Sequence, residues 1–315
     1  MVKILITGAG GFIGSRLIKT LLKETWITSI ECYDNLMYNK NSLLSYAADS
    51  RFIFTKGDVR DSSKLHQSLK RNDIIISLAA LVGASLCEKN QEDTWKINYL
   101  ANRFLANNKS NDQALIYPNT NSGYGITDGK TEITEQDLLN PISSYGKSKC
   151  EAEEAIRLVD NHIIFRLATV FGSSPRMRTD LLVNNLVFKA LKDSYIVLYE
   201  NQAIRNYVHI QDVCDAFIFS ILNWDTHKNE VYNFGNDKLN MSKLDLCNEI
   251  NKTIPFEIIK AEYTKDCDKR NYVVSSKKFY NKGFKECVFD IEYGVKELLK
   301  AYNMIEDDFI VHANY

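Results

Sequence analysis

The chain has 315 residues, of which 45% are hydrophobic and 25% charged, so it can bury the core of one large domain or of two closely joined ones. Its formal net charge of -1 provides no general attraction for nucleic acid or for an anionic membrane, and we expect neither as a partner. The seven cysteines are scattered without a Cys-x-x-Cys pair, and the five histidines stand apart. This usage predicts a reducing, cytoplasmic location and no metal site. No apolar run is long enough to span a bilayer.

Strands and helices alternate along the first half of the chain. Short β-branched and apolar runs predict strands at residues 2–7, 27–33, 51–55, 73–79, 114–117 and 163–170. Apolar residues at helical spacing predict helices at residues 12–23, 61–69, 95–107 and 144–158, with Asp61 as an N-cap. Such alternation is typical of a parallel sheet with helices on both faces. We therefore expect an α/β fold with a Rossmann-type doubly wound parallel sheet.

The regular alternation stops after about Gly172. Helices are expected at residues 180–191 and 209–222, mixed with short strands near 195–198, 207 and 231–234. We interpret this part as a smaller α/β lobe at the C-terminal side. The proposed boundaries give residues 1–170 to the first domain, with 206–235 returning to it. The smaller lobe then comprises residues 171–205 and 236–315.

A glycine-rich turn joins the first strand to the first helix. Gly8, Gly11 and Gly14 are spaced three apart, which permits a tight turn, close approach of the backbone to a pyrophosphate, and close packing of helix and sheet. Asp34 follows Gly14 by twenty residues, at the end of the second strand. Its carboxylate can bind ribose hydroxyls and would repel a 2′-phosphate. The pattern predicts NAD rather than NADP; the alternative is a glycine turn without a ligand.

Tyr145 and Lys149 lie one helical turn apart, on the helix that follows the fifth strand. A phenol has a pKa of about 10 and is a poor base at neutral pH. A neighbouring ammonium and an oxidised nicotinamide would both favour the phenolate, which makes Tyr145 usable as a general base. A surface pair is the alternative for any such spacing, but the position within a dinucleotide-binding fold favours catalysis.

These motifs together resemble the extended short-chain dehydrogenase/reductase family along almost the whole chain. The matching segments are Thr7–Gly14, Asp34–Leu36, Gly57–Val59, Leu78–Ala80, Tyr145–Lys149 and Arg205–His209. In that family a Ser or Thr lies four residues before a Tyr-Gly pair, and the resemblance assigns this catalytic role to Thr120. It also implies a set of NAD-binding residues: Gly8, Gly11, Phe12, Ile13, Gly14, Asp34, Asn35, Asp58, Val59, Leu78, Ala79, Ala80, Asn98, Tyr145 and Lys149.

The same resemblance implies a nucleoside-diphosphate sugar as substrate, bound in the smaller lobe. Arg205 and Arg270 would contact the diphosphate, because a planar guanidinium matches phosphate oxygens in pairs. A surface ion pair is the alternative for each arginine. The full set of implied substrate-binding residues is Val82, Thr120, Asn121, Thr169, Arg178, Asn184, Arg205 and Arg270. The helices at 95–107 and 144–158 imply a homodimer, although amphipathic helices also pack inside monomers.

Asn121 and Ser122, which follow Thr120, bear on which reaction the chain carries out. Sugar 4,6-dehydratases of the family resemble one another in having Asp-Glu directly after the catalytic Thr, whereas Asn121 and Ser122 stand there in this chain. Neither side chain is an acid or a base at neutral pH, so dehydration is disfavoured. A 4-epimerase and a 4-dehydrogenase remain open. A protein that senses the dinucleotide without chemistry is a remote alternative.

Several longer segments are similar to the GDP-mannoheptose 4-dehydrogenases of bacterial capsule polysaccharide biosynthesis. They are Leu78–Ala84, Tyr117–Gly125, Arg166–Gly172, Ser174–Arg178 and Asp268–Arg270. The resemblance implies oxidation at C4 of GDP-mannoheptose to the 4-keto sugar. Tyr145 would then be the base, assisted by Thr120 and Lys149.

Overall fold

Seven parallel strands form the central sheet of the computed structural model, which describes residues 1–38, 41–261, 270–305 and 313–314. Their order is β11-β7-β5-β4-β1-β2-β3, so the order reverses between β1 and β4. A doubly wound sheet of this order has its binding crevice at that reversal, beyond the carboxyl ends of the strands. The expected fold is thereby confirmed. The strands are β1 Val2–Thr7, β2 Ile27–Asp34, β3 Phe52–Lys56, β4 Ile74–Ser77, β5 Ala114–Thr120, β7 His162–Leu167 and β11 Glu230–Phe234.

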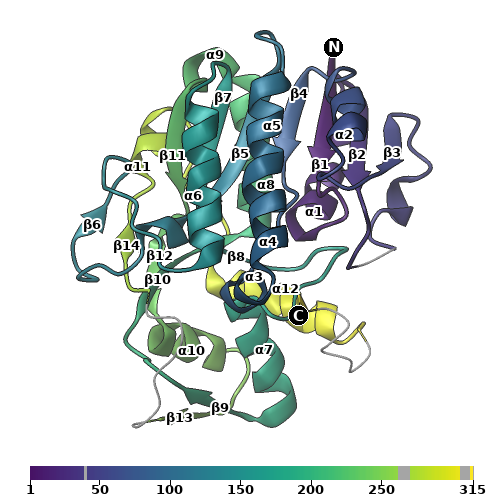
Figure 1. Cartoon of the computed structure of the whole chain (residues 1–315). Coiled ribbons are helices and arrows are strands. Elements are labelled where there is room, and N and C mark those ends of the chain that lie inside the picture. Colours follow the sequence, from purple (N-terminus) through teal and green to yellow (C-terminus); the bar gives the residue numbers. More distant parts are fainter. Residues whose placement is uncertain (39–40, 262–269, 306–312, 315) are drawn as a thin grey trace.

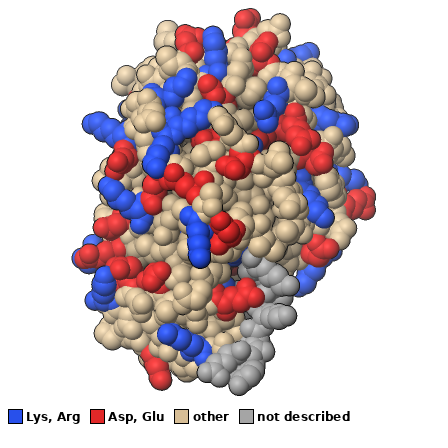
Figure 2. Space-filling view, turned by 90° about the vertical axis from the view of Figure 1, so that its left-hand side faces the viewer, with Lys and Arg blue, Asp and Glu red and all other residues tan. Residues whose placement is uncertain are grey.

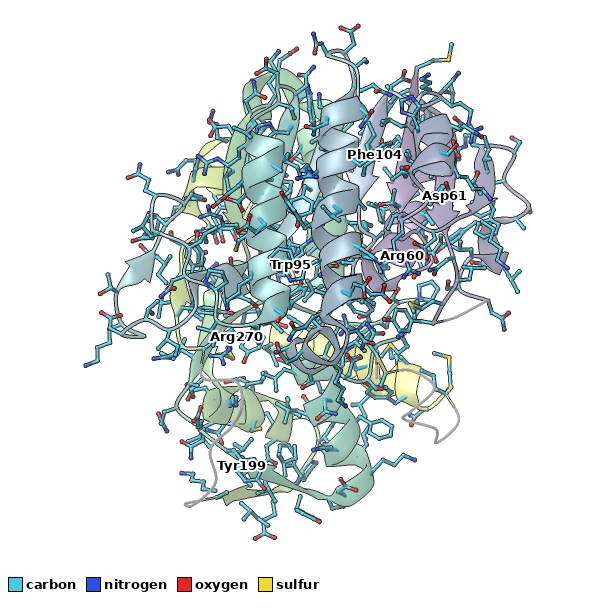
Figure 3. All side chains as sticks on the ribbon, in the orientation of Figure 1. Arg60, Asp61, Trp95, Phe104, Tyr199 and Arg270 are labelled. Carbon is cyan, nitrogen blue, oxygen red and sulfur yellow. The ribbon has the colours of Figure 1, made fainter. Side chains whose placement is uncertain are left out.

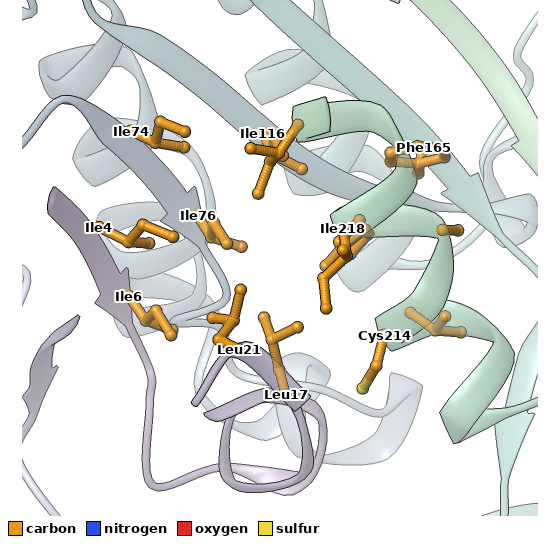
Figure 4. Close-up of a cluster of buried hydrophobic side chains, with 14 of the residues drawn as sticks. Ile4, Ile6, Leu17, Leu21, Ile74, Ile76, Ile116, Phe165, Cys214 and Ile218 are labelled. Carbon is orange, nitrogen blue, oxygen red and sulfur yellow. The ribbon is translucent and has the colours of Figure 1, made fainter. Parts of the chain in front are cut away.

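Helices cover both faces of this sheet (Figure 1). On one face, α1 (Phe12–Leu21) and α8 (Ile210–Leu222) pack against alternate strand residues such as Ile4 and Ile6 (Figure 4). On the other face, Leu5 packs with α2 (Ser62–Leu69), α5 (Ala101–Asn108) and α6 (Ser144–Arg157). Because both faces are covered, the central strands are continuous apolar runs rather than half-polar ones. Within the described residues, no helix has both the length and the apolarity needed to cross a membrane.

A second core lies beyond the carboxyl ends of the strands. The elements that build it are α7 (Leu182–Asp193), β9 (Tyr195–Leu198), α10 (Lys243–Asn251) and α12 (Ile291–Tyr302). Figure 1 shows α7, α10, β9 and β13 (Glu257–Lys260) together at the lower end of the view, below the central sheet. The carboxyl ends of the central strands therefore face this second, separately packed group of elements.

Smaller elements join the two cores. The strands β8 (Thr169–Phe171), β10 (Ile204–His209) and β12 (Asn236–Ser242) form one short sheet, and β6 (Glu132–Ile133) pairs with β14 (Val273–Val274). The remaining helices are α3 Ala84–Lys89, α4 Gln91–Thr94, α9 Trp224–His227 and α11 Lys277–Asn281, with 3-10 turns at Leu44–Tyr46 and Asn121–Tyr124.

The expected strand at residues 163–170 is wrong as one element. It divides at Ala168 into β7, which belongs to the central sheet, and β8, which pairs with β10. The backbone N–H of Ala168 still donates to Phe234 O, and the chain then turns away into the short sheet. One continuous run, apolar apart from Arg166 and Thr169, therefore serves two sheets, which its pattern alone does not reveal.

The expected helix at residues 95–107 also differs in detail. Residues 91–108 are helical throughout, but Trp95–Leu100 is π-helical between α4 and α5. The wider turn contains Asn98, whose side-chain amide bonds both backbone polar groups of Leu81. Asp61 caps α2 as expected, accepting a hydrogen bond from the Lys64 N–H.

We predict that Phe279→Ala lowers the free energy of unfolding by about 3–5 kcal/mol, the usual cost of removing a buried aromatic ring. Phe279 of α11 is fully buried, and its ring centroid lies 5.2 Å from that of Phe165 and 4.9 Å from that of Phe284. Denaturant unfolding measures the loss. Leu138→Ala, at a side chain that is 90% exposed, is the control and should change stability by less than about 0.5 kcal/mol. A loss below about 1 kcal/mol for Phe279→Ala would contradict the tight packing of this ring against Phe165 and Phe284.

Candidate active site

A cleft of about 560 Å³ lies where six strands of the central sheet end. Its lining includes Gly8 after β1, Asp34 of β2, Gly57 after β3, Leu78 after β4 and Thr120 of β5. Residues of the smaller lobe line its other side. The cleft therefore occupies the crevice that the strand order creates.

The glycine turn forms one wall of the cleft at the start of α1. Gly8 has φ +69°, and a Cβ there would lie 2.6 Å from the Ala79 backbone nitrogen. A Cβ on Gly14 would lie 2.6 Å from Gly8 O. No side chain caps the helix, and Gly11, Phe12 and Ile13 line the cleft. Glycine at positions 8 and 14 lets the turn pack tightly against the chain after β4 and against α1, and the N-terminal N–H groups of α1, which no side chain caps, fit a pyrophosphate.

Acidic side chains gather at the end of the cleft beside β2. The Asp34 carboxylate accepts hydrogen bonds from Gly10 N (2.8 Å) and Leu36 N (2.6 Å), which fix its orientation, and burial raises its pKa. Asp58 accepts from Asn35 and pairs with Arg60 at 2.8 Å, which lowers the Asp58 pKa to about 2. Arg60 is also paired with Asp93. This end fits ribose hydroxyls, and a 2′-phosphate would meet two carboxylates.

The three expected catalytic residues line the same cleft. Thr120 ends β5, while Tyr145 and Lys149 lie on the first turns of α6, which Ser143 caps through the Gly146 N–H. Thr120 hydrogen-bonds Tyr145, so the two hydroxyls are neighbours. The Lys149 ammonium lies over the Tyr117 ring, 4.0 Å from its centroid.

Burial dominates the titration of this group. It raises the pKa of Tyr145 to about 12, against the opposing effects of Arg178, Arg270 and the Thr120 hydrogen bond. It lowers the pKa of Lys149 to about 7. The expected lowering of the Tyr145 pKa by Lys149 is therefore not the net effect in the chain alone, because removal from water disfavours both charged forms. Additional positive charge in the cleft is needed to stabilise the phenolate.

A buried ion pair lies behind the catalytic residues. Glu153 of α6 and Arg166 of β7 are 1% and 3% exposed at their side chains and are joined at 2.6 Å. Asn119 donates to Glu153 and accepts from the Thr120 N–H, while Arg166 donates to the Tyr124 hydroxyl. The pair thus connects the end of β5 to the helix that carries Tyr145 and Lys149.

The substrate side of the cleft is cationic. Six of the expected substrate residues line the cleft: Val82, Thr120, Thr169, Arg178, Arg205 and Arg270. All the expected cofactor residues except Asn98 line it as well. Arg178 is paired with Asp180 at 2.5 Å. Two buried cations that were not expected from the sequence also line the cleft, Arg176 and Lys243. Arg176 falls in a segment with a family resemblance, whereas nothing in the sequence singles out Lys243, the first residue of α10.

Three expected site residues do not line the cleft. The Asn98 amide is bonded to Leu81, and the Asn184 amide to Gly172 and Arg178 O, so both side chains support neighbouring loops. Asn121 is 1% exposed, and its amide has no hydrogen-bond partner among the described residues. These three do not enter the site. Asp268 and Lys269 of the segment Asp268–Arg270 lie outside the described residues.

The cationic side chains are a local feature of the cleft. On the face drawn in Figure 2, Lys and Arg are interspersed with Asp and Glu, as the net charge of -1 leads one to expect. In the described part of the chain, no three His, Cys, Asp or Glu side chains are grouped to hold a metal ion. The site is thus a cleft with a pyrophosphate cradle, an acidic ribose end, a Thr-Tyr-Lys group and a cationic far side.

Proteins that are similar to this chain include enzymes that use NAD and nucleotide sugars, which agrees with the features of the cleft. The model of the NAD dependent epimerase/dehydratase family matches residues 4–235. The uncharacterized UDP-glucose epimerase YtcB of Bacillus subtilis is 28% identical over 247 residues, 74% of this chain and 76% of that protein. The dTDP-D-glucose 4,6-dehydratase of Dictyostelium discoideum is 28% identical over 270 residues, 79% of this chain but 61% of that longer protein. The crystal structure of a UDP-glucuronic acid 4-epimerase from Bacillus cereus, in complex with UDP-glucuronic acid and NAD, superposes with a TM-score of 0.85. It is 23% identical, covers 96% of this chain and 100% of that one, and shows a shared fold.

We predict that Arg166→Met costs about 3–5 kcal/mol of unfolding free energy, because it leaves the Glu153 carboxylate buried without its partner. The double variant Arg166→Met/Glu153→Leu removes both charges and should regain most of that loss. Chemical denaturation of the two variants and the unaltered chain tests the point. A double variant as unstable as Arg166→Met alone would show that packing, not the lost charge pair, sets the cost.

Proposed function

Since the chain belongs to the NAD dependent epimerase/dehydratase family, we propose that it oxidises a secondary alcohol of a nucleoside-diphosphate sugar bound beside NAD. The observation that carries this proposal is the presence of Thr120, Tyr145 and Lys149 in one cleft with the glycine turn. Arg178, Arg205 and Arg270 line the same cleft and supply the charge that a diphosphate needs.

The residues divide the chemistry among them. Tyr145 takes the hydroxyl proton of the sugar, and Thr120 donates a hydrogen bond to the oxygen as it acquires negative charge. Lys149 holds the cofactor ribose and favours the Tyr145 phenolate. NAD, when bound, supplies the acceptor for the hydride that leaves the same carbon, so that a ketone remains. The start of α1, with Phe12 and Ile13 after the glycine turn, binds the pyrophosphate.

The best-supported substrate is GDP-mannoheptose, oxidised at C4 to the 4-keto sugar. The proposal rests on the segments that resemble GDP-mannoheptose 4-dehydrogenases, and two structural observations disfavour dehydration. Asn121 lies outside the cleft, and the Ser122 hydroxyl is bonded to Thr120 and Arg270. A 4,6-dehydratase needs an acid and a base here, and neither position provides one.

A 4-epimerase is the second candidate, and the relative from Bacillus subtilis favours it because its name is that of a UDP-glucose epimerase. Both reactions begin with the same oxidation at Tyr145. They differ in whether the keto sugar leaves or is reduced again on its other face. A protein that only senses the dinucleotide would retain Gly8, Gly11 and Asp34 without needing Tyr145.

Reduced-nicotinamide absorbance of the chain, at stoichiometric concentration with NAD and GDP-mannoheptose, separates the two reactions. Lasting NADH together with a C4 ketone supports the dehydrogenase. A new epimer without lasting NADH supports the epimerase. If neither lasting NADH nor a new epimer forms, with GDP-mannoheptose or with a panel of UDP- and GDP-hexoses, then both the dehydrogenase and the epimerase are ruled out.

We also propose a homodimer in the cytoplasm. The helices expected to form the interface are α5 and α6 with the π-helical segment. The partly exposed Trp95 and Phe104 lie on the side of the molecule drawn in Figure 3, and Leu100 of the π-helical segment is 41% exposed. All six described cysteines are unpaired, as suits a reducing compartment. Sedimentation of the unaltered chain and of Phe104→Glu, which should be monomeric, tests the dimer.

We predict that Tyr145→Phe lowers the rate of alcohol oxidation about 10²- to 10⁴-fold, the usual contribution of a general base. NAD affinity should remain within a few-fold, because the phenyl ring still fills the same site. Single-turnover NADH formation and NAD titration by fluorescence measure the two quantities. Retention of the rate would eliminate Tyr145 as the base.

We predict that Asp34→Ser reduces the preference for NAD over NADP by about tenfold or more, since it removes the carboxylate that repels a 2′-phosphate. Binding of both dinucleotides measured by calorimetry tests this expectation. Glu24→Gln, at a partly exposed carboxylate on the loop after α1 that accepts a hydrogen bond from the Trp26 indole N–H, is the matched control and should leave the preference unchanged. Equal NADP binding before and after the Asp34 change would refute this basis for cofactor selection.

A further inference from the structure

Arg270 extends from the smaller lobe to the 3-10 turn that follows β5 and the catalytic Thr120. It precedes β14, and Figure 3 shows it where the central sheet meets the lower group of elements. Its Nη1 donates to the Ser122 hydroxyl. A residue expected to bind only the diphosphate is therefore also in contact with the segment that follows Thr120.

Ser122 in turn holds the catalytic threonine. Its hydroxyl oxygen accepts a hydrogen bond from Thr120 Oγ1 at 3.0 Å, and its backbone N–H donates to the same Thr120 Oγ1 at 3.1 Å. Ser122 is 5% exposed, so water does not readily replace these bonds. The Thr120 hydroxyl is thus fixed by two groups of one residue, and that residue is fixed by Arg270.

We propose that Arg270 is a positioning residue of the reaction: acting through Ser122, it sets the Thr120 hydroxyl against the reacting oxygen. The proposal rests on the proposed function, in which Thr120 stabilises that oxygen. It goes beyond diphosphate binding because it makes the smaller lobe part of the catalytic assembly.

The hydrogen-bond chemistry of the three groups allows this role. In the structure the Thr120 hydroxyl donates to Ser122 Oγ. Hydroxyl hydrogens rotate, so with substrate bound Thr120 can turn its hydrogen to the substrate oxygen, and Ser122 can then donate to Thr120. Arg270 has no acceptor and always donates, which gives the series Arg270, Ser122, Thr120 and substrate oxygen a single direction. Each donor in such a series polarises the next, and the terminal bond is strengthened.

The guanidinium can serve the diphosphate at the same time. It carries five N–H groups in a fixed fork, and the contact with Ser122 uses one nitrogen. A diphosphate bound to the same guanidinium would hold Arg270 in place, and with it Ser122 and Thr120. Binding at one end of the substrate is thereby coupled to the geometry at the other end.

Arg270 also contributes to the charge around Tyr145. The groups that act on this phenol are Cys87 of α3, Arg178 after β8, Thr120 and Tyr117 of β5, and Arg270 itself, while Lys149 lies one turn away on the same helix. Among these, Arg178, Arg270 and the Thr120 bond oppose the rise in the Tyr145 pKa that burial causes. Loss of Arg270 therefore raises the Tyr145 pKa and shifts the acid limb of the rate profile to higher pH.

A double-mutant cycle tests the proposal. With the nucleotide sugar that the unaltered chain oxidises, Ser122→Ala should lower kcat roughly tenfold, as for one lost bond to a charged group, with little change in KM. Arg270→Gln should lower kcat and also raise KM, since it removes a diphosphate contact. In the double variant, kcat should fall no further than in Arg270→Gln alone.

Two controls separate positioning from damage to the fold. Ser220→Ala removes another buried serine hydroxyl, in α8, and Arg157→Gln removes an exposed arginine at the end of α6; neither should alter kcat. NAD binding and the unfolding midpoint should be unchanged in Ser122→Ala. Independent, multiplicative losses in kcat, or an unchanged kcat in Ser122→Ala, would overturn the proposal.

A second readout does not depend on turnover. The phenolate of Tyr145 is followed by ultraviolet absorbance against pH, as the difference between each variant and its Tyr145→Phe counterpart with NAD present. Arg270→Gln should move the Tyr145 midpoint to higher pH, and Ser122→Ala should move it less. If no nucleotide sugar is turned over, the proposed function fails, and this titration still decides whether Arg270 acts on the catalytic group. An unmoved midpoint in both variants would contradict that action.

Discussion

The buried ion pair between Arg166 and Glu153 is the constraint on which the geometry of the cleft depends. Two charges removed from water are costly unless both are paired and hydrogen-bonded, so the structure tolerates only arrangements that keep them together. Glu153 follows Lys149 by one turn of α6, and Asn119 connects the same carboxylate to the backbone of Thr120. A shift of α6 along β5 would break these bonds. The spacing of the catalytic residues is therefore held by a charge pair that touches none of the reacting atoms.

Electrostatics then divides the cleft into two ends. Asp34 and Asp58 lie at one end, while the arginines of the smaller lobe lie at the other. A nucleoside, which is uncharged, and a diphosphate, which is anionic, fit opposite ends of such a site. The net charge of -1 conveys nothing of this separation, because the opposite charges cancel in the sum over the chain. Local placement, not overall charge, decides which ligand can bind.

What the sequence could predict follows from how far each signal reaches along the chain. The glycine turn, Asp34 and the pair Tyr145 and Lys149 are recognised from short spacings, because a turn or one helical face fixes where those groups lie. The division at Ala168 was missed, since a mostly apolar run looks the same whether it serves one sheet or two. Asn98 and Asn184 were placed in the site by family resemblance, but their amides are used by neighbouring loops. Lys243 reaches the cleft through a tertiary arrangement that no local pattern encodes.

The titration of Tyr145 explains why the smaller lobe matters to the chemistry. Burial makes the phenol a weaker acid than it is in water, and Lys149, buried beside it, readily loses its own charge. A catalytic base assembled only from the first domain would therefore stay protonated at neutral pH. The positive charges that favour the phenolate come from Arg178 and Arg270, which belong to segments beyond β8, and from the oxidised nicotinamide when it is bound. Proton transfer from the substrate hydroxyl to Tyr145 accordingly requires groups from both sides of the cleft.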